Sequence, residues 1–274
     1  MADTEHITLV ELGVDDAPAG LLLSTEAHWN QSEADWRFFL RQGLVFGVRD
    51  GKRLVATAAL LPYTAGDAWI SMALVTANWR RRGIATRLVD ACLNAATGRG
   101  LTTWLDATPD GARVYGPLGF TPTLQLRRLR LPARAKAGPA QSLSACSPGD
   151  FVARDQRAMG FDRSSLLKAF GERAGSRMVS LGDAAALIRD GRTARHIGPL
   201  FAETHESALN LVDAIVRSEQ GPWLLDAVHS QDDFLKGLTT AGWTIERPFQ
   251  RMRFGRTTML AAEPAFAVAG PEFG

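Results

Sequence analysis

Short runs of apolar residues, separated by turn-forming residues, divide the first part of the chain into strands and helices. A strand is predicted where apolar residues alternate or form a short bounded run, and a helix where they recur every three or four residues. Asp50-Gly51 stands between two apolar runs and predicts a β-hairpin, because glycine readily takes the positive φ of a tight turn. The predicted elements are strands at 7–12, 44–48, 54–61 and 69–76 and helices at 18–29 and 32–42.

A longer helix is predicted from Ile84, because the apolar residues after it fall on one helical face and the pattern ends at two glycines. Cys92 lies on this face, so we interpret its thiol as part of the core. A strand is predicted at 101–107. The run Thr108-Pro109-Asp110 then has the features of a helix start, namely a capping hydroxyl, a proline at the first position and an acid in the first turn.

The second half of the chain repeats this order of elements in a weaker form. Trp223-Leu224-Leu225-Asp226-Ala227 resembles Trp104-Leu105-Asp106-Ala107. Further along the chain, the run at 104–107 is followed by Gly119-Phe120 and the run at 223–227 by Gly242-Trp243. Residues 133–149 are rich in Ala, Pro, Gly and Ser and have no helical or strand periodicity, which is typical of a linker. We therefore expect two copies of one α/β unit, at 1–132 and 150–274.

Composition and charge exclude several classes of protein. Of the 274 residues, 46% are hydrophobic and 22% charged, near the average of globular domains, and the net charge is +2. The near-neutral charge argues against a dedicated nucleic-acid or membrane surface. No window approaches the roughly 18 apolar residues of a membrane span, and the first residues lack the features of a secretory signal. A cytoplasmic location is expected.

The cysteines and histidines predict no metal centre. Cys92 and Cys146 are too few for a disulfide framework or a cysteine-based zinc site, so reduced, structural thiols are expected. The five histidines form no ligand-spaced pair, and no G-x-S-x-G motif occurs. We expect neither a bound metal nor a nucleophilic triad.

The segment with the clearest chemistry is Arg80-Arg81-Arg82-Gly83-Ile84-Ala85-Thr86, between a predicted buried strand and a helix. A helix N-terminus offers unpaired N–H groups and the positive end of the helix dipole, and guanidiniums add charge. These features suit a pyrophosphate. The alternative is a solvated basic run before an ordinary helix, since the segment is neither a Walker loop nor a dinucleotide-binding fingerprint.

Together with Tyr115-Gly116-Pro117-Leu118-Gly119-Phe120, this segment resembles the GNAT superfamily of N-acyltransferases over about residues 5–132. The resemblance implies an α/β fold with a twisted mixed sheet flanked by helices, and acetyl-coenzyme A as co-substrate. It implies that backbone groups of Leu74 and Val75 bind the pantetheine arm and the acetyl carbonyl, where the fourth and fifth strands separate. It assigns the pyrophosphate to Arg80, Arg81, Arg82, Gly83, Ile84, Ala85 and Thr86.

The resemblance also makes Tyr115 the general acid that assists the departing coenzyme A thiolate. A phenol has a pKa of about 10, close to that of a thiol, so the proton transfer is reasonable. The alternative is a half-buried aromatic residue on a short helix. No carboxylate lies in 69–75 to act as the general base. The open candidates are a chain of water molecules or one of Glu26, His28, Asp35 and Asp67.

The region that joins the first two helices overhangs the acceptor site in the GNAT fold. Glu26, Trp29 and Asn30 are therefore candidates for binding the acceptor substrate, and Trp29 would wall an apolar or cationic one. The alternative for Trp29 is a buried anchor between two helices.

The second copy lacks a counterpart of the arginine-rich loop. Its fourth strand is predicted at 195–200, and Glu203, near the start of the next helix, would repel phosphate. No tyrosine precedes Ala241-Gly242-Trp243, and 266–274 is expected to form a last strand and a tail. The whole chain thus resembles tandem GNAT proteins with an active N-terminal copy and a degenerate C-terminal copy that does not bind coenzyme A.

The sequence predicts an acyl-coenzyme-A-dependent N-acetyltransferase, acting as a monomer or homodimer. Acetyl would move to a primary amine of a small molecule by direct attack in a ternary complex. Acetylation of protein lysines or N-termini is an alternative, and so is a non-catalytic coenzyme A sensor or scaffold. Neither nucleic acid nor membrane is expected as a partner, because Arg80 to Arg82 are a single basic run in a near-neutral protein.

Overall fold

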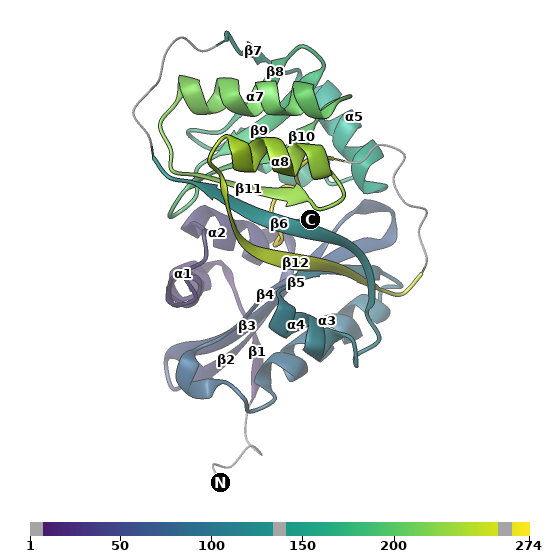
Figure 1. The fold of residues 1–274 in the computed structure, drawn as a ribbon. Helices are drawn as coiled ribbons and strands as arrows, with labels where there is room; N and C mark the ends of the chain where they lie inside the picture. The colour runs from purple at the N-terminus through teal and green to yellow at the C-terminus, as the bar shows by residue number, and fades with distance from the viewer. Residues whose placement is uncertain (1–7, 134–140, 257–264) are drawn as a thin grey trace. The chain divides into compact units, whose positions relative to one another are not determined.

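The computed structural model describes residues 8–133, 141–256 and 265–274. Their contacts separate into two compact units (Figure 1). Unit 1 consists of residues 1–105 and 253–255, and unit 2 of residues 106–252 and 256–274. Each unit combines helices with a mixed arrangement of strands, which confirms the predicted α/β fold.

Unit 1 contains strands that neighbour one another in the order β1-β2-β3-β4-β5. All neighbours pair antiparallel except β4 and β5, which are parallel. Gly51 has a φ of 56° between β2 and β3, so the predicted hairpin is confirmed. The strands are β1 (Leu9–Glu11), β2 (Leu44–Asp50), β3 (Arg53–Pro62), β4 (Asp67–Val75) and β5 (Thr102–Ala107), whose last two residues belong to unit 2.

Three α-helices pack on these strands: α1 (Ala17–Glu26), α2 (Glu33–Gln42) and α3 (Ile84–Thr97). The predicted start of α2 is confirmed, because the Ser32 hydroxyl accepts from the Asp35 backbone N–H and the Asp35 carboxylate accepts from that of Ser32. Gly20 lets α1 approach α2 closely, since a Cβ there would overlap the ring of Trp36. Helix α1 ends at Glu26, earlier than predicted.

Unit 2 contains strands in the order β12-β6-β11-β10-β9-β8-β7. The pair β10 and β11 is parallel, and β6 pairs antiparallel with β11 from Leu126↔Val228 to Leu131↔Trp223. This pairing draws the last strand of the first copy, and with it α4 (Pro109–Tyr115), into unit 2. The strands are β6 (Thr121–Leu131), β7 (Ser144–Ala145), β8 (Arg177–Leu181), β9 (Ala184–Arg189), β10 (Arg195–Phe201), β11 (Trp223–Val228) and β12 (Thr244–Phe254).

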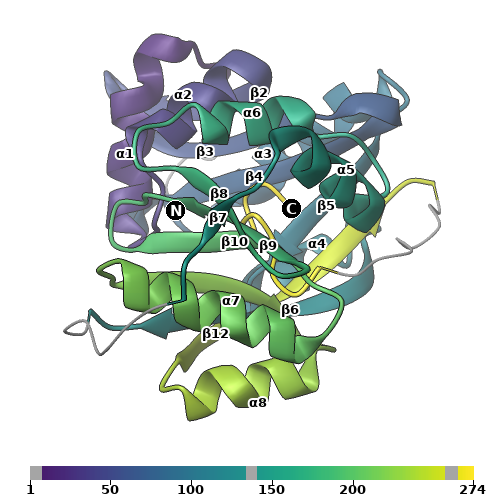
Figure 2. The same ribbon diagram turned by 90° about the horizontal axis from the view of Figure 1, so that it is seen from above.

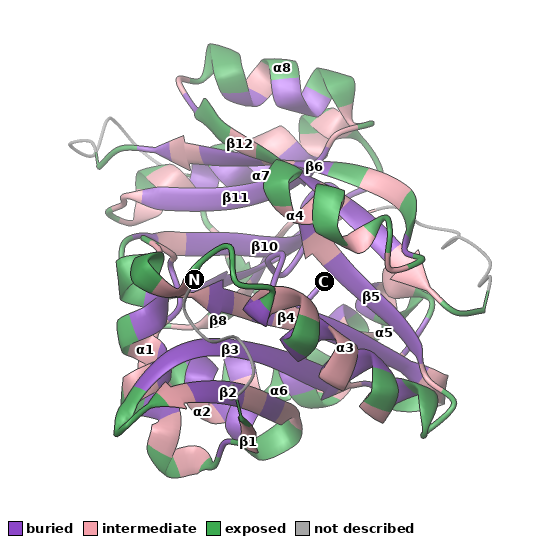
Figure 3. Cartoon of the chain, turned by 90° about the horizontal axis from the view of Figure 1, so that it is seen from below, coloured by how far each residue is buried: buried purple, intermediate pink, exposed green. Residues whose placement is uncertain are grey.

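Helices cover both faces of the unit 2 strands (Figure 2): α7 (His205–Ser218) and α8 (Asp232–Thr240) one face, and α5 (Pro148–Met159) and α6 (Ser164–Gly171) the other. Strand β9 serves both faces, because alternate side chains of a strand point in opposite directions. Ala186 and Ile188 join the core beneath α7, whereas Arg189 lies against Phe170 of α6. The inner strands are buried and the outer turns of α8 exposed (Figure 3).

Part of the predicted linker is regular structure. Within 133–149, residues 144–145 form β7 and Pro148 begins α5, while 134–140 lie outside the described residues. A strand of two residues is too short to produce an alternating pattern, so the sequence shows no sign of β7 within this segment. Residue 7, the first of the predicted strand 7–12, also lies outside the described residues.

Candidate functional site

Strands β4 and β5 are paired only at their beginnings. Their parallel register ends at Trp69↔Trp104, and these two rings stack with centroids 6.5 Å apart. The indole N–H of Trp104 donates to the Asp67 carboxylate at 2.7 Å. Beyond Trp69, β4 continues to Val75 with no ladder to β5 among the described residues of unit 1. The strands therefore separate and leave one edge of β4 without a strand partner.

A β-bulge lies in this separated part of β4. Met72 and Ala73 stand opposite the single residue Ala58, because the register with β3 shifts there. Met72 has a φ of 52°, which is rare for a residue with a side chain, and its carbonyl accepts from Thr57 Oγ1 at 2.8 Å. The buried hydroxyl of Ser71 has no hydrogen-bond partner in the described part of the chain. Bulges and unusual backbone conformations are frequent beside functional sites.

The predicted pyrophosphate loop joins β4 to α3 and is exposed. Arg81 and Gly83 both have positive φ, of 60° and 70°. Helix α3 begins at Ile84, and the backbone N–H of Arg87 bonds to the carbonyl of Gly83 at 3.1 Å. The N–H groups of the first helical turn before Arg87 have no intrahelical acceptor. The start of α3 thus offers donors and a positive dipole end to an anion.

Two of the three loop arginines bond to backbone carbonyls, one at the end of β4 and one within the loop. Arg80 Nε donates to the Val75 carbonyl at 3.0 Å, and Arg82 donates to the Asn78 carbonyl at 2.9 Å. The Arg82 guanidinium also lies 4.8 Å from the centroid of the Trp79 ring. These contacts hold exposed positive charge beside the helix start, which favours anion binding.

Glu26, a predicted substrate-binding and general-base candidate, anchors the start of this loop. Its carboxylate accepts from Thr76 Oγ1 at 2.6 Å and from the Ala77 backbone N–H at 2.9 Å, and Arg53 lies 3.9 Å away. The hydrogen bond from Thr76, followed by that from Ala77, lowers the pKa of Glu26 below its ordinary value. A carboxylate with a lowered pKa takes up protons less readily, which disfavours Glu26 as the base.

The remaining candidates for the general base and for the acceptor site differ in their contacts. The carboxylates of Asp35 and Asp67 are buried and bonded, to the start of α2 and to an indole. His28 follows α1 with a φ of 57°. Trp29 is half-buried and Asn30 is buried in the segment between α1 and α2. These hydrogen bonds disfavour Asp35 and Asp67 as the general base, and the water chain and His28 stay predictions.

Tyr115 is the last residue of α4 and belongs to unit 2, whereas the arginine loop belongs to unit 1. The predicted start of α4 is confirmed, because the Thr108 side chain accepts from the Gly111 backbone N–H. Tyr115 is half-buried, and its ring centroid lies 6.0 Å from that of Phe120. A Cβ at Gly111 would lie 3.0 Å from the Tyr115 ring, so glycine makes room for it.

Strands β10 and β11 of unit 2 repeat the geometry of β4 and β5. Their parallel register again covers three residue pairs and ends at Ile197↔Leu225. Gly198 and Pro199 then form a bulge opposite Leu187 of β9. The strands separate beyond this bulge, as β4 and β5 do.

The segment 266–274 fills the space between β10 and β11. Ala267 is bridged to both Leu200 of β10 and Ala227 of β11. The Leu200 N–H donates to the Ala267 carbonyl at 3.0 Å, and the Phe266 N–H donates to the Leu200 carbonyl at 2.8 Å. Every residue of the segment is buried. The expected last strand is thus a pair of isolated bridges, and the tail is an internal part of unit 2.

The loop from β10 to α7 differs in length and charge from the arginine loop. It contains only residues 202–204, whereas 76–83 join β4 to α3. The Thr204 side chain caps the helix start, and the Glu203 backbone N–H donates to the Asp183 carboxylate at 2.6 Å. Glu206 adds an acid in the first turn of the helix. The donors at this helix start are thus partly satisfied, and its charge repels phosphate.

Two buried arginine–aspartate pairs mark a repeat that was only partly recognised from the sequence. Arg128 bonds to Asp226 at 2.7 and 2.8 Å, and Arg251 bonds to Asp106 at 2.8 Å through both oxygens. His196 Nε2 also lies 3.0 Å from Asp226. Burial alone would raise the pKa of Asp226, but Arg128 and His196 lower it below its ordinary value. The sequence contained a signal for this repeat, because Arg128 follows Gly119-Phe120 at the same spacing as Arg251 follows Gly242-Trp243.

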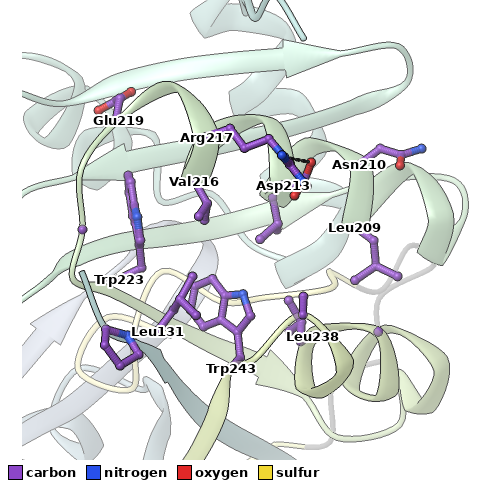
Figure 4. Close-up of a pocket in the computed structure, with 15 residues that line it drawn as sticks. Leu131, Leu209, Asn210, Asp213, Val216, Arg217, Glu219, Trp223, Leu238 and Trp243 are labelled. Carbon is purple, nitrogen blue, oxygen red and sulfur yellow. Dashed lines mark hydrogen bonds and ion pairs between the residues drawn. The ribbon is translucent and has the colours of Figure 1, made fainter. Parts of the chain in front are cut away.

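A separate cavity of about 380 Å³ lies in unit 2 between α7, α8 and the start of β11 (Figure 4). Trp223 and Trp243 form part of its apolar wall. The charged groups at its rim are paired, Arg217 with Asp213 at 2.6 Å and Glu219 with Arg195. The cavity contains none of the predicted site residues.

Neither cysteine is placed as a nucleophile. Cys92 is fully buried in α3, and burial raises the pKa of its thiol to about 12. Cys146 is half-buried, and burial also raises the pKa of its thiol. Within the described ranges, no three His, Cys, Asp or Glu residues are grouped to hold a metal ion. No described helix combines the length and apolarity needed to cross a bilayer.

Comparison with known proteins identifies relatives of both copies. The GNAT acetyltransferase family model matches residues 13–120, and a second model, of a GNAT acetyltransferase domain, matches 152–267. Together they cover more than two thirds of the chain. The chain is also 23% identical over 234 residues to YitH, an uncharacterized N-acetyltransferase of Bacillus subtilis, with 80% of this chain and 81% of that protein covered.

Solved structures share the fold over nearly the whole chain. A candidate acetyltransferase from Pyrococcus horikoshii has a TM-score of 0.82 at 19% identity, covering 98% of this chain and 96% of that one. A tandem GNAT protein from the clavulanic acid biosynthesis pathway has a TM-score of 0.64 at 15% identity, covering 92% and 100%. At these identities the likeness shows the arrangement of the elements.

Proposed function

Because the chain belongs to the GNAT acetyltransferases, with two such domains in tandem, we propose that its N-terminal domain transfers acetyl from acetyl-coenzyme A to a primary amine of a small molecule. The chain is an acyl-coenzyme-A-dependent acetyltransferase. The observation that carries the proposal is the edge of β4 that has no strand partner among the described residues and leads directly into the arginine loop. We place the domains at 1–132 and 150–274, joined by 133–149.

The second domain provides an internal example of what the β4 edge can bind. Leu200 follows the bulge of β10 as Leu74 follows the bulge of β4. Leu200 exchanges backbone hydrogen bonds with the segment 266–274. The pantetheine arm of coenzyme A carries two amides and is extended, like a peptide. We infer that it lies along Leu74 and Val75 and uses the same kinds of backbone group.

The loop after β4 supplies the positive charge for the pyrophosphate. Hydrogen-bond donors come from the backbone amides at the start of α3 and from the exposed side chains of Arg80, Arg81 and Arg82. Gly83 provides the positive φ before the helix. The proposed contacts come from Arg80, Arg81, Arg82, Gly83, Ile84, Ala85 and Thr86.

Acyl transfer needs a free amine, a polarised carbonyl and an acid for the leaving group. In the proposed reaction the amine nitrogen attacks the thioester carbon, the carbon–sulfur bond breaks, and Tyr115 protonates the departing thiolate and regains its proton from water. Backbone N–H groups of β4 polarise the carbonyl. The excess proton of the amine leaves through water. Direct attack fits the burial of Cys92, because no described thiol is exposed and ionised to carry an acyl group.

One tandem GNAT protein of similar fold comes from the clavulanic acid biosynthesis pathway. Because that pathway makes a small molecule, its GNAT protein supports a small-molecule acceptor for this chain. Trp29 and Asn30, in the segment after α1, are proposed to contact the acceptor. Trp29 is half-buried, so part of its ring is accessible to a ligand.

The first experiment is calorimetric titration of acetyl-coenzyme A into the unaltered chain and an Arg82→Glu/Gly83→Glu variant. Binding at one site per chain is expected, with loss of at least 100-fold in affinity in the variant because acids replace a cation and a glycine at the anion site. Glu203→Gln, in the corresponding loop of the second domain, is the matched control and should bind normally. Absence of binding to the unaltered chain would overturn the proposal.

Tyr115→Phe tests the acid role separately. Turnover with a panel of small amines, followed by release of free thiol, should fall about 100-fold while the KM for acetyl-coenzyme A changes little. Full turnover of Tyr115→Phe at all pH values would remove the tyrosine from the reaction. Transfer only to protein lysines or N-termini would replace the proposed substrate class.

A further inference from the structure

The cleft between β10 and β11 is shaped around a peptide backbone. Gly198, in the bulge of β10, has a φ of 153°, and a Cβ there would overlap the carbonyl oxygen of Val268. The Val268 N–H donates to the Asp226 carbonyl of β11 at 3.0 Å. A glycine is therefore needed on the cleft wall because the segment 266–274 passes against it.

One buried cation on the cleft wall is paired by the same segment. Arg189 of β9 is 2% exposed, and it donates to the Ala269 carbonyl at 2.8 Å and pairs with Glu272 at 3.3 Å. Both hydrogen-bonded partners of Arg189 among the described residues belong to 266–274. Arg163 donates to the Phe273 carbonyl at 3.0 Å. Removal of the segment would leave the Arg189 charge buried and unpaired, which is strongly unfavourable.

Aromatic contacts fix the two ends of the segment. The Phe266 ring meets Phe234 of α8 edge to face, with centroids 5.3 Å apart. The Phe273 ring meets Phe170 of α6 in the same way at 4.9 Å. Such pairs stabilise beyond the burial of their area. The segment is therefore held by its backbone at the centre and by an aromatic ring on each side.

We propose that the cleft of the second domain is a peptide-strand binding site, occupied in cis by residues 266–274. Its ligand is a peptide that begins with an aromatic residue, pairs with the strands through small or aliphatic residues, and then turns, as 270–274 do, so that an acid meets Arg189. Such strand addition uses backbone groups for affinity and side-chain pockets for specificity. Coenzyme A has no access to this cleft while the peptide is bound. This inference holds whether or not the first domain binds acetyl-coenzyme A.

The test separates the peptide from the cleft without shortening the chain. Ala267 is 0% exposed, so Ala267→Asp places a carboxylate in the cleft and displaces the segment while the cleft walls stay unaltered. The melting temperature should fall by about 10 °C. A synthetic peptide with the natural sequence of residues 265–274 should bind this variant in trans and restore most of the loss.

Two controls make the result specific. The same peptide carrying Ala267→Asp should bind at least tenfold more weakly, and the unaltered chain should not bind the natural peptide because its cleft is occupied. An unchanged melting temperature in Ala267→Asp, or a folded variant that ignores the natural peptide, would overturn the proposal.

A cysteine pair, Leu200→Cys/Ala267→Cys, decides the matter if Ala267→Asp fails to fold. These residues are bridged across the cleft, so oxidation should join them and raise the melting temperature. Acetyl-coenzyme A binding should be the same before and after oxidation. Loss of binding on oxidation, or failure of the bond to form, would overturn the inference. Absence of binding to the unaltered chain would instead count against the proposed function alone.

Discussion

The strand pairs β4/β5 and β10/β11 begin alike and receive different partners. Each pair is parallel over three residue pairs, and in each the first strand bulges and then separates from the second. In unit 1 the separated edge leads into an exposed loop with three arginines. In unit 2 the corresponding edge is covered by residues 266–274. The same backbone geometry is thus covered by another segment of the chain in unit 2, and in unit 1 it is the edge along which we propose that coenzyme A binds.

The loop after each separated strand is held by a carboxylate, which is a further similarity between the two units. Glu26 accepts from the Ala77 backbone N–H in unit 1, and Asp183 accepts from that of Glu203 in unit 2. The pKa of each acid is lowered by its hydrogen bonds, first by those from the Thr76 and Ser207 side chains. The anchoring is shared, so the two loops differ in their length and in the charge of their residues.

The largest expected effect is the loss of the Asp226 carboxylate, which joins the strands on one side of the filled cleft. Asp226→Ala should destabilise unit 2 by about 3–5 kcal/mol, because Arg128 stays buried without its partner. The matched change, Asp106→Ala, should destabilise less, because it removes the ion pair with Arg251 and disturbs no histidine. Urea unfolding of both variants measures the difference, and equal effects would contradict the special role of the His196–Asp226–Arg128 cluster.

The same residue gives a pH dependence with a defined sign. Because Arg128 and His196 hold the pKa of Asp226 below its ordinary value, the stabilisation is complete above the unfolded pKa of about 3.9. It is lost as the pH falls through the lower pKa of the folded state. Asp226→Asn should therefore flatten this part of the acid-unfolding profile, whereas an unchanged profile would show that other groups control it.

The next prediction compares two glycines with positive φ, one packed against the segment 266–274 and one with free space beside it. Gly198→Ala should cost about 3 kcal/mol of unfolding free energy, because its Cβ overlaps the carbonyl of Val268. Gly182 also has a positive φ, of 59°, but a Cβ there meets nothing within 4 Å. Gly182→Ala should cost only about 1 kcal/mol. Equal losses in denaturant titrations would mean that conformation, rather than the buried segment, requires glycine at both positions.

A smaller effect tests whether the two loop anchors differ in function. Glu26→Gln should weaken acetyl-coenzyme A binding about tenfold, or about 1.4 kcal/mol, because it removes charge-assisted hydrogen bonds that position the start of the arginine loop. Asp183→Asn is its counterpart in the second domain. It should leave the affinity within about twofold of the unaltered chain, as measured by calorimetry. Weakened binding in Asp183→Asn instead would assign the ligand to the other loop.

The smallest expected effect concerns the ring beside Arg82. Trp79→Ala should weaken acetyl-coenzyme A binding about two- to fivefold, because a partly exposed cation–π contact contributes about 0.5–1 kcal/mol to holding the guanidinium. Trp79→Phe should recover most of the loss. If both variants bind equally well to the unaltered chain, the ring does not position Arg82.

Local elements were predictable because neighbouring residues determine them. The Asp50-Gly51 hairpin, the Ser32 cap of α2 and the Thr108 cap of α4 all appear where their residues indicated. The GNAT resemblance followed from two short motifs in the first half and the tandem arrangement from a weaker repeat in the second half, and the family matches confirm both. Periodicity, capping chemistry and positive φ act over a few residues, so one sequence displays them.

Long-range pairings could not be predicted in the same way. Nothing in the local pattern of 121–131 indicates that β6 pairs with β11, which groups α4 and Tyr115 with unit 2. Glu26 was a candidate for chemistry, and only its contacts with Thr76 and Ala77 show it as a loop anchor. Such contacts depend on which backbone edges remain unsatisfied after the strands have assembled.

The sequence by itself determined the elements, their repetition, the family and the charge of the loop at 80–83. The tertiary structure decided which of the two strand separations, β4/β5 or β10/β11, is filled by residues 266–274. Residues 266–274 look like an ordinary apolar end of the chain, yet they satisfy the backbone edges of β10 and β11 and the buried charge of Arg189. The physical reason is that every buried N–H, C=O and guanidinium needs a partner, and only the folded chain determines which segment can reach it.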